Sequence, residues 1–239
     1  MHARTPEQQE SKPSGEIRTR TPRVATLRSS IDHIVVTAPS LEVGAEYVRD
    51  ALGVTPETGG EHPRMGTHNC LLRLGDRLYL EVIAINPAAG NPDRPRWFQL
   101  DVERSNAAPS LATWISRTND IYAATAAALV PLGTIEAMSR GPFNWQITVP
   151  ANGTLPLGGV APTLIEWKPD SHPADTLKDV GCTLVRLEGF HPQSPAILSM
   201  LQSIGFQGPF TVSPISPEES PCLVAHVQTP AGICQLRSS

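Results

Sequence analysis

The chain has 239 residues, enough to bury the core of one large domain or of two small ones. Its formal net charge of −4 offers no basic face for a nucleic acid, so we expect no nucleic-acid partner and favour an enzyme or a small-ligand-binding protein. No apolar run reaches the ~18 residues of a membrane span, and the N-terminus lacks the apolar core of a secretory signal, so we predict a cytoplasmic protein with no membrane partner.

Residues 1–30 are rich in Pro, Ser, Thr, Glu and Arg and contain almost no large apolar side chains. Such a segment cannot bury enough surface to offset the entropy of ordering, so it is predicted to form a flexible N-terminal arm. Its arginines suit a partner-binding arm or a targeting peptide. Its glutamates argue against a transit peptide, because transit peptides are poor in acidic residues.

A first structural module begins directly after this arm. The β-branched, apolar stretch at 31–38 predicts a strand. Apolar residues then recur at helical spacing over 40–53, with Ser40 as the N-cap and Gly53 at the C-cap. After a Gly/Pro-rich stretch, two apolar segments flank the dipeptide Gly75-Asp76, which predicts a strand, a turn and a strand. The module therefore reads strand, helix, short strand, strand, strand.

The same order of elements recurs further along the chain. Residues 110–120 predict a strand and residues 121–133 a helix, and these align without gaps on the first module, glycine on glycine. A fainter third copy begins at Cys182. When only the order of predicted elements is compared, any α+β chain looks repetitive, but the matched helix-end glycines favour true repeats. We predict an α+β fold of repeated βαβββ modules, with two modules forming a cupped mixed sheet over 31–175 and a third C-terminal module over 176–239.

The repeat places a histidine and a carboxylate close together. His33 lies in the first strand of the first module and Glu81 in the fourth. With the strand order 1-4-3-2 these strands are neighbours, so both side chains can reach one divalent ion. The aligned residues of the second module are Thr113 and Glu166, so one expected ligand is a threonine. The alternative is that His33 is a half-buried polar group and the glutamates are solvated, but both glutamates interrupt apolar runs, where an unpartnered carboxylate is costly.

Two further histidines belong to the same region. If Gly75-Asp76 is a two-residue hairpin turn, Glu81 faces Cys70 and His68 shares the face of Glu81. His68 is then a candidate ligand, acid/base or hydrogen-bond partner. His62 lies in the loop GGEHPRMG, whose glycines suit either a close approach to a ligand or a sharp turn.

Segments of both modules resemble a known family: DHIVV, GGEHPRMGTHN and YLEVIAI in the first, and SRGPFNWQIT, LPLGG and PTLIEWK in the second. They are similar to glyoxalase-like domain proteins of the vicinal oxygen chelate (glyoxalase/bleomycin resistance/dioxygenase) superfamily. The resemblance covers residues 31–175 and implies paired βαβββ modules around a cleft.

The resemblance also implies a set of metal ligands on the first and last strands of both modules, which correspond to His33, Glu81, Thr113 and Glu166. Thr113 departs from the pattern, but His33, Glu81 and Glu166 would leave open positions that suit Zn²⁺, Fe²⁺, Mn²⁺ or Ni²⁺. Such an ion would act as a Lewis acid on vicinal oxygens of a small substrate, in a lyase, isomerase or dioxygenase reaction. On this hypothesis Glu166 and His68 are the candidate catalytic residues.

Two more residues would line the cleft implied by the resemblance. Arg140 would pair with an anionic group of the substrate, and Trp145 would form a wall of the pocket. Together with His62 they are the candidate substrate-binding residues. The alternatives are a surface charge for Arg140 and a core residue for Trp145. A metal-free member of the family would bind a small ligand in the same cleft, and Thr113 favours this second reading. An unpaired third module leaves sheet edges that a homodimer would cover.

Overall fold

The computed structural model describes residues 1, 26–102, 107–168 and 172–238. Most of the predicted N-terminal arm lies outside these residues. Its last two residues, Ser29 and Ser30, are already part of the first strand. Just before them, the backbone N–H of Arg28 donates to the side chain of Asn119, whose amide donates back to the carbonyl of Thr26. The boundary predicted after residue 30 is therefore wrong, because this segment is fastened to the second module.

The first module has the predicted order of elements: β1 (Ser29–Thr37), α1 (Leu41–Leu52), β2 (Glu57–His62), β3 (Thr67–Gly75) and β4 (Leu78–Ile85). Both predicted caps of the helix are present. The side chain of Ser40 accepts a hydrogen bond from the backbone of Val43, and Gly53 has a φ of 72°, which favours glycine. These local signals fix where the helix begins and ends.

The second module repeats this order: β5 (Ser110–Thr118), α2 (Ile121–Ala127), β6 (Thr134–Arg140), β7 (Phe143–Val149) and β8 (Thr163–Lys168). Asp120 caps α2 as Ser40 caps α1. The helix predicted to reach Gly133 ends at Ala127 instead. Pro131 explains the early end, because proline cannot donate the helical hydrogen bond and disfavours helix at the residue before it.

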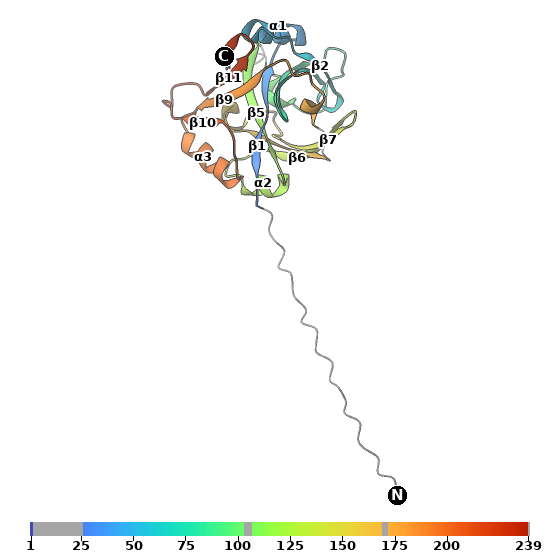
Figure 1. Cartoon of the computed structure of the whole chain (residues 1–239), viewed down its shortest axis with the longest axis vertical. Helices are drawn as coiled ribbons and strands as arrows, with labels where there is room; N and C mark the ends of the chain where they lie inside the picture. The colour runs from blue at the N-terminus through green and yellow to red at the C-terminus, as the bar shows by residue number, and fades with distance from the viewer. Residues whose placement is uncertain (2–25, 103–106, 169–171, 239) are drawn as a thin grey trace.

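The two modules form one eight-stranded sheet with the order β2-β3-β4-β1-β5-β8-β7-β6. The central strands β1 and β5 are antiparallel, whereas β1 with β4 and β5 with β8 are parallel. The edge strands β2 and β6 contact each other, so the sheet curls into a cup (Figure 1). The predicted cupped mixed sheet is thus confirmed, and its curl brings β6 of the second module to the first.

The C-terminal segment contains β9 (Thr183–Phe190), α3 (Ser194–Ser203), β10 (Phe210–Ser213), β11 (Cys222–Thr229) and β12 (Gly232–Arg237). It has the predicted order of elements but a different pairing, β10-β9-β11-β12. This small sheet lies to one side of β1 and β5 (Figure 1). A homodimer through its edge strands β10 and β12 stays a prediction.

The cupped sheet has a convex and a concave face with separate cores. On the convex face, Ile34, Trp114 and Leu164 belong to a large core shared with α1, α2, α3 and the small sheet. On the concave face, Val35, Ile115 and other apolar side chains form a smaller core. Among the described residues no helix is long and apolar enough to cross a membrane. The concave face carries the candidate site.

Candidate functional site

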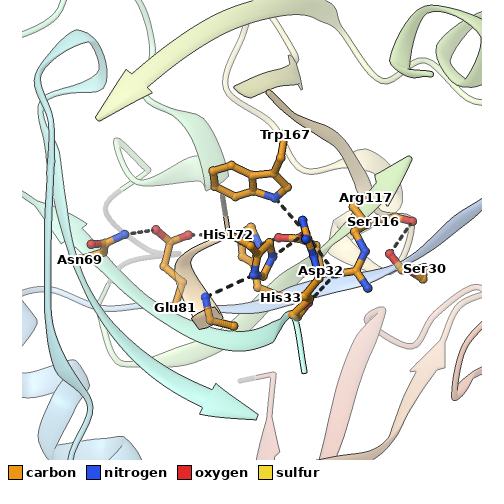
Figure 2. Close-up of polar contacts among 11 residues, drawn as sticks. Ser30, Asp32, His33, Asn69, Glu81, Ser116, Arg117, Trp167 and His172 are labelled. Carbon is orange, nitrogen blue, oxygen red and sulfur yellow. Dashed lines mark hydrogen bonds and ion pairs between the residues drawn. The ribbon is translucent and has the colours of Figure 1, made fainter. Parts of the chain in front are cut away.

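His33 and Glu81 come together on the concave face, as the sequence predicts. His33 pairs with Tyr79 of β4, and Glu81 pairs with Val35 of β1, so both side chains share one face. The His33 Nε2 atom lies 3.6 Å from Glu81 Oε2, and both side chains are buried (Figure 2). The contact follows directly from the parallel pairing of β1 with β4.

Asp32 joins this pair through a β-bulge. The register of β1 against β5 passes from Ile31 to His33, which leaves Asp32 as an extra residue. Its Oδ1 atom lies 2.7 Å from His33 Nδ1, and its Oδ2 atom accepts hydrogen bonds from Trp167 Nε1 at 3.0 Å and from His172 Nε2 at 3.1 Å. The fully buried carboxylate therefore has three hydrogen-bond partners, and Arg117 Nη1 lies 3.9 Å from its Oδ2 atom (Figure 2).

The three side chains, Asp32, His33 and Glu81, stabilise one another's charged forms. Burial alone would raise the pKa of Glu81. The hydrogen bond to His33 and the charge of His33 outweigh this effect and lower the pKa to about 2. Burial also raises the pKa of Asp32, and bonds from His172 and His33 hold it well below its usual range. Burial lowers the pKa of His33, but the two carboxylates raise it above its ordinary value. The result is a carboxylate–imidazole–carboxylate row.

Asn69 occupies the place predicted for His68. The β3–β4 pairing sets Leu71 against Glu81, not Cys70, so Asn69 and not His68 shares the face of Glu81. The prediction for His68 is wrong by one residue, because the turn is centred on Asp76 and Arg77 and the register shifts between Arg73 and Gly75.

The hydrogen bonds of Asn69 connect the row to its surroundings. Its Nδ2 atom donates to Glu81 Oε1 at 2.5 Å. His68 instead points from the opposite face of the sheet, where it interacts electrostatically with Glu42 of α1, and its Nε2 atom is buried without a hydrogen-bond partner. Asn69 is thus the polar neighbour of Glu81 in the cup.

Glu166 does not reach the site, which corrects the predicted ligand set. Its Oε2 atom accepts a hydrogen bond from the backbone N–H of Ile121 at the start of α2, and its Oε1 atom pairs with Lys168. The neighbouring residues Ile165 and Trp167 line the concave pocket instead. Side chains of a strand alternate between faces, so Glu166 points to the helix side of the sheet.

The pairing also identifies the true counterpart of Glu81. In the first module Val35 pairs with Glu81, and in the second module the aligned residue Ile115 pairs with Thr163. Thr113, the aligned counterpart of His33, donates its hydroxyl to the carbonyl of Gly159. The second module therefore presents threonines where the first presents a histidine and a glutamate.

Arg140 enters the cup from the end of β6 and lies beside His62. Its Nη1 atom is 3.2 Å from His62 Nε2 and 3.0 Å from Asn69 Oδ1. Gly60 of β2 makes this approach possible, because a Cβ there would lie 2.8 Å from the Arg140 Cδ atom. Both roles predicted for the glycines of this loop occur: Gly60 allows the close approach of Arg140, and Gly66, with a φ of 60°, ends the turn after His62.

Aromatic side chains surround these polar groups. Trp145 lines the pocket as predicted, together with Trp97, Phe98 and Trp167. The ring of Tyr79 stacks on that of His33, with 4.4 Å between the ring centroids. The remaining cavity is about 20 Å³, which suffices for about one water molecule. Protein atoms therefore nearly fill the inner pocket, which is defined by His33, Glu81, Asn69 and Arg140 and their aromatic walls.

The donor set does not fit a divalent metal ion. His33 and Glu81 supply two donor atoms, and no group of three or more His, Cys, Asp or Glu side chains in the described parts of the chain could hold a metal. Glu166 and Thr113 are engaged elsewhere. The Arg140 guanidinium lines the same pocket, and its positive charge would repel a cation.

Five residues of this region were not among the predicted site residues: Asp32, Asn69, Tyr79, Trp167 and His172. Asp32 precedes His33, so regular alternation would place it on the other face of the sheet, and the bulge overrides that rule. His172 is fully buried at the start of the short 3₁₀ turn η4 (Pro173–Asp175), outside any strand pattern. Trp167 follows Glu166 in the same strand, so assigning the concave face of that strand to Trp167 and not to Glu166 would have identified it.

His62 makes the stability of the protein dependent on pH. Burial, with smaller contributions from the charges of Arg140 and His33, lowers its pKa to about 4. Below pH 6.5 the unfolded chain binds a proton that the folded protein does not, so stability falls as the pH decreases towards 4. Between pH 7 and pH 5 we expect this group to cost roughly 2 kcal/mol.

The matched variant is His62→Gln, which retains a side-chain acceptor for Arg140 but has no titrating group. Urea unfolding of both proteins at pH 7 and pH 5 isolates the contribution of His62, because the other titrating groups are common to both. We expect the loss on acidification to be smaller in the variant. Equal losses in the two proteins would show that His62 is not kept neutral by burial.

A family model described as a glyoxalase-like domain matches residues 31–205. No curated protein matches the sequence. Among solved structures, a hypothetical protein from Staphylococcus aureus has 14% sequence identity and a TM-score of 0.51, with 87% of this chain and 84% of that chain covered. At this identity the similarity concerns the fold alone.

Two enzymes also appear among the similar structures. Methylmalonyl-CoA epimerase from Mycobacterium tuberculosis has 18% identity and a TM-score of 0.40, covering 59% of this chain and 88% of that chain. A mutant of 4-hydroxymandelate synthase from Streptomyces coelicolor has 15% identity and a TM-score of 0.40, covering 87% of this chain and 62% of that chain.

Proposed function

The chain belongs to the glyoxalase-like domain family of the vicinal oxygen chelate superfamily, and from this premise we propose that its concave pocket binds a small anionic organic molecule without the help of a metal ion. Arg140 would hold the anionic group. His33 and Glu81 would form the floor of the pocket. The misfit of the donor set to a divalent cation supports this reading over the metal-assisted one.

One observation carries the proposal: the partners of Arg140 inside the pocket are neutral. Asn69 is an amide, and the lowered pKa of His62 keeps its imidazole uncharged near pH 7. Across the described residues, no carboxylate lies within ion-pair distance of Arg140. A guanidinium held this way is suited to a carboxylate, which it can bind through two parallel hydrogen bonds.

A metal-independent enzyme is the second candidate, and the row of Asp32, His33 and Glu81 favours it. His33 lies between two carboxylates at the floor of the pocket, so a proton can be held there next to a bound acid. A lyase or isomerase that moves a proton would use this row. A dioxygenase, the third reaction class implied by the resemblance, would need a redox centre for which the pocket offers no fitting ligand set.

Titration calorimetry of the full chain with benzoate, in buffer containing EDTA, tests the proposed function. We expect binding in the wild type and at least about tenfold weaker binding in Arg140→Gln, because a hydrogen bond to a charged group contributes roughly 1.5–3 kcal/mol. Arg73→Gln is the control, since Arg73 lies at the other end of β3 and pairs with Asp76. Equal affinity of the Arg140 variant and the wild type would overturn the proposal.

A further inference from the structure

The shape of the site specifies the class of anion. Building on the function proposed above, we propose that the ligand is amphipathic, with a carboxylate head at Arg140 and an apolar tail in a second, adjoining hollow. This outer hollow lies between the 3₁₀ turn η1 (Pro63–Met65) and β6, and its walls include Pro63, Ala137 and Met138. The carboxylate would lie at the inner pocket, and the tail would remain outside it.

The sizes of the two spaces support this division. The inner pocket has a cavity of about 20 Å³, which has room for about one water-sized group such as a carboxylate oxygen, whereas the outer hollow has about 220 Å³. Three residues, His62, Trp97 and Trp145, line both spaces. These three side chains form the boundary between the two spaces, so a ligand that is bound at Arg140 and fills the outer hollow would pass between their rings.

Strand β6 contributes a side chain to each of the two spaces, an apolar one to the outer hollow and a cationic one to the inner pocket. Met138 and Arg140 are two residues apart, so they project from the same face of the strand. Met138 packs against the concave-face core beside the outer hollow, and Arg140 reaches the inner pocket. One face of β6 thus presents the apolar side chain of Met138 next to the cationic side chain of Arg140. Met138 would contact the tail of the ligand and Arg140 its carboxylate.

The charged groups around the outer hollow are already engaged. The Nη2 atom of Arg64 pairs with Glu136 Oε2 at 2.5 Å, and its Nη1 atom donates to the carbonyl of Ala137 at 3.3 Å. Glu136 also pairs with Arg94. What the hollow offers to a ligand is therefore mainly apolar surface, which favours a hydrocarbon tail over a second charged group.

A larger hollow of about 620 Å³ lies elsewhere, along the start of β5 and the loop that leads to β11. Only Phe98 is common to this hollow and the inner pocket. Its lining includes no residue of β6, so a ligand anchored at Arg140 has no continuous apolar path into it. The outer hollow is the better receptor for the tail.

The experiment is a titration of the full chain with acetate, butanoate and hexanoate, followed by NMR of the indole N–H signals. We expect the affinity to rise about fourfold per added methylene, because burying a CH₂ group contributes about 0.8 kcal/mol. The signals of Trp97 and Trp145 should shift further as the tail lengthens. Trp114 is an internal control, since it is buried on the convex face and donates to the carbonyl of Val160.

A variant locates the tail. Met138→Gln places an amide of similar size in the outer hollow, and we expect the ratio of hexanoate to acetate affinity to fall at least about fourfold. Leu129→Gln is the matched control, since Leu129 is exposed and lines neither space. This control should leave the ratio unchanged.

The possible outcomes separate this inference from the proposed function. If affinity is independent of chain length, or Met138→Gln leaves the ratio unchanged, the tail does not occupy the outer hollow and this inference is overturned. The proposed function still stands in that case, provided that binding depends on Arg140. If none of the acids binds to the wild type, the proposed function is overturned and this inference with it.

Discussion

Replacing Asp32 with asparagine is expected to lower the free energy of unfolding by about 3–5 kcal/mol, since it removes one partner from a buried ion pair. Asp32 is fully buried and accepts from Trp167 and His172 as well as contacting His33. Asparagine has nearly the same shape but no charge, so the raised pKa of His33 loses one of its two supports. Urea unfolding at pH 7 measures the effect.

The control for this variant is Asp50→Asn. Asp50 lies on the exposed side of α1, where its carboxylate approaches Arg49 in solvent. Its replacement should change stability by less than about 0.5 kcal/mol. If Asp32→Asn also changed stability by less than about 0.5 kcal/mol, the carboxylate–imidazole–carboxylate row would contribute nothing to holding β1, β8 and η4 together.

The second large effect is expected for Trp114→Ala, which should cost about 3–5 kcal/mol. Trp114 of β5 is fully buried at the junction of the cupped sheet with the C-terminal segment. Its ring packs on Phe206 and Phe210, with ring centroids 5.3 Å and 4.7 Å away. Its removal leaves a cavity between the two sheets, which thermal and urea unfolding would detect.

Two results bear on this second prediction. Leu129→Ala, at an exposed position, should be nearly neutral. Because the large core is continuous across both sheets, wild-type unfolding should be one cooperative transition. A separate early transition of residues 176–239, or a loss below about 1 kcal/mol in Trp114→Ala, would mean that the C-terminal segment does not share the core.

The fold could be predicted because its signals are local. Ser40 and Gly53 mark the ends of α1 through capping and left-handed backbone, and the strands show as apolar runs. The pairing of the C-terminal strands could not be predicted, because an apolar pattern marks a strand but does not name its neighbour. The early end of α2 was visible in Pro131, which a glycine-based alignment overlooked.

The site was predicted where it depended on strand order and missed where it depended on register. Adjacent strands bring His33 and Glu81 together whatever the details of the turns. The placement of His68, by contrast, depended on counting residues from a turn, and a register shift before Gly75 reversed its face. A bulge likewise turned Asp32 towards His33.

For Glu166 the difficulty was the length of the loop before the last strand. The sequence comparison of the two modules makes Glu166 the counterpart of Glu81. The strand pairing gives that position to Thr163, and Glu166 lies on the opposite face of β8. Arg140 and Trp145 were predicted through the family resemblance, and the curl of the sheet brings both to the pocket.

The central claim is that the pocket holds an anion through Arg140 and not a metal through His33 and Glu81. The most direct test is the dissociation constant of benzoate for Glu81→Gln relative to the wild type, both purified without chelators. Glutamine keeps the volume and an acceptor for Asn69, but it removes a negative charge from the pocket floor. We therefore predict that benzoate binds the variant as tightly as the wild type or more tightly. Binding weakened about tenfold or more would contradict the claim, because it would mean that the carboxylate of Glu81 is itself needed to hold the ligand, as a metal site would require.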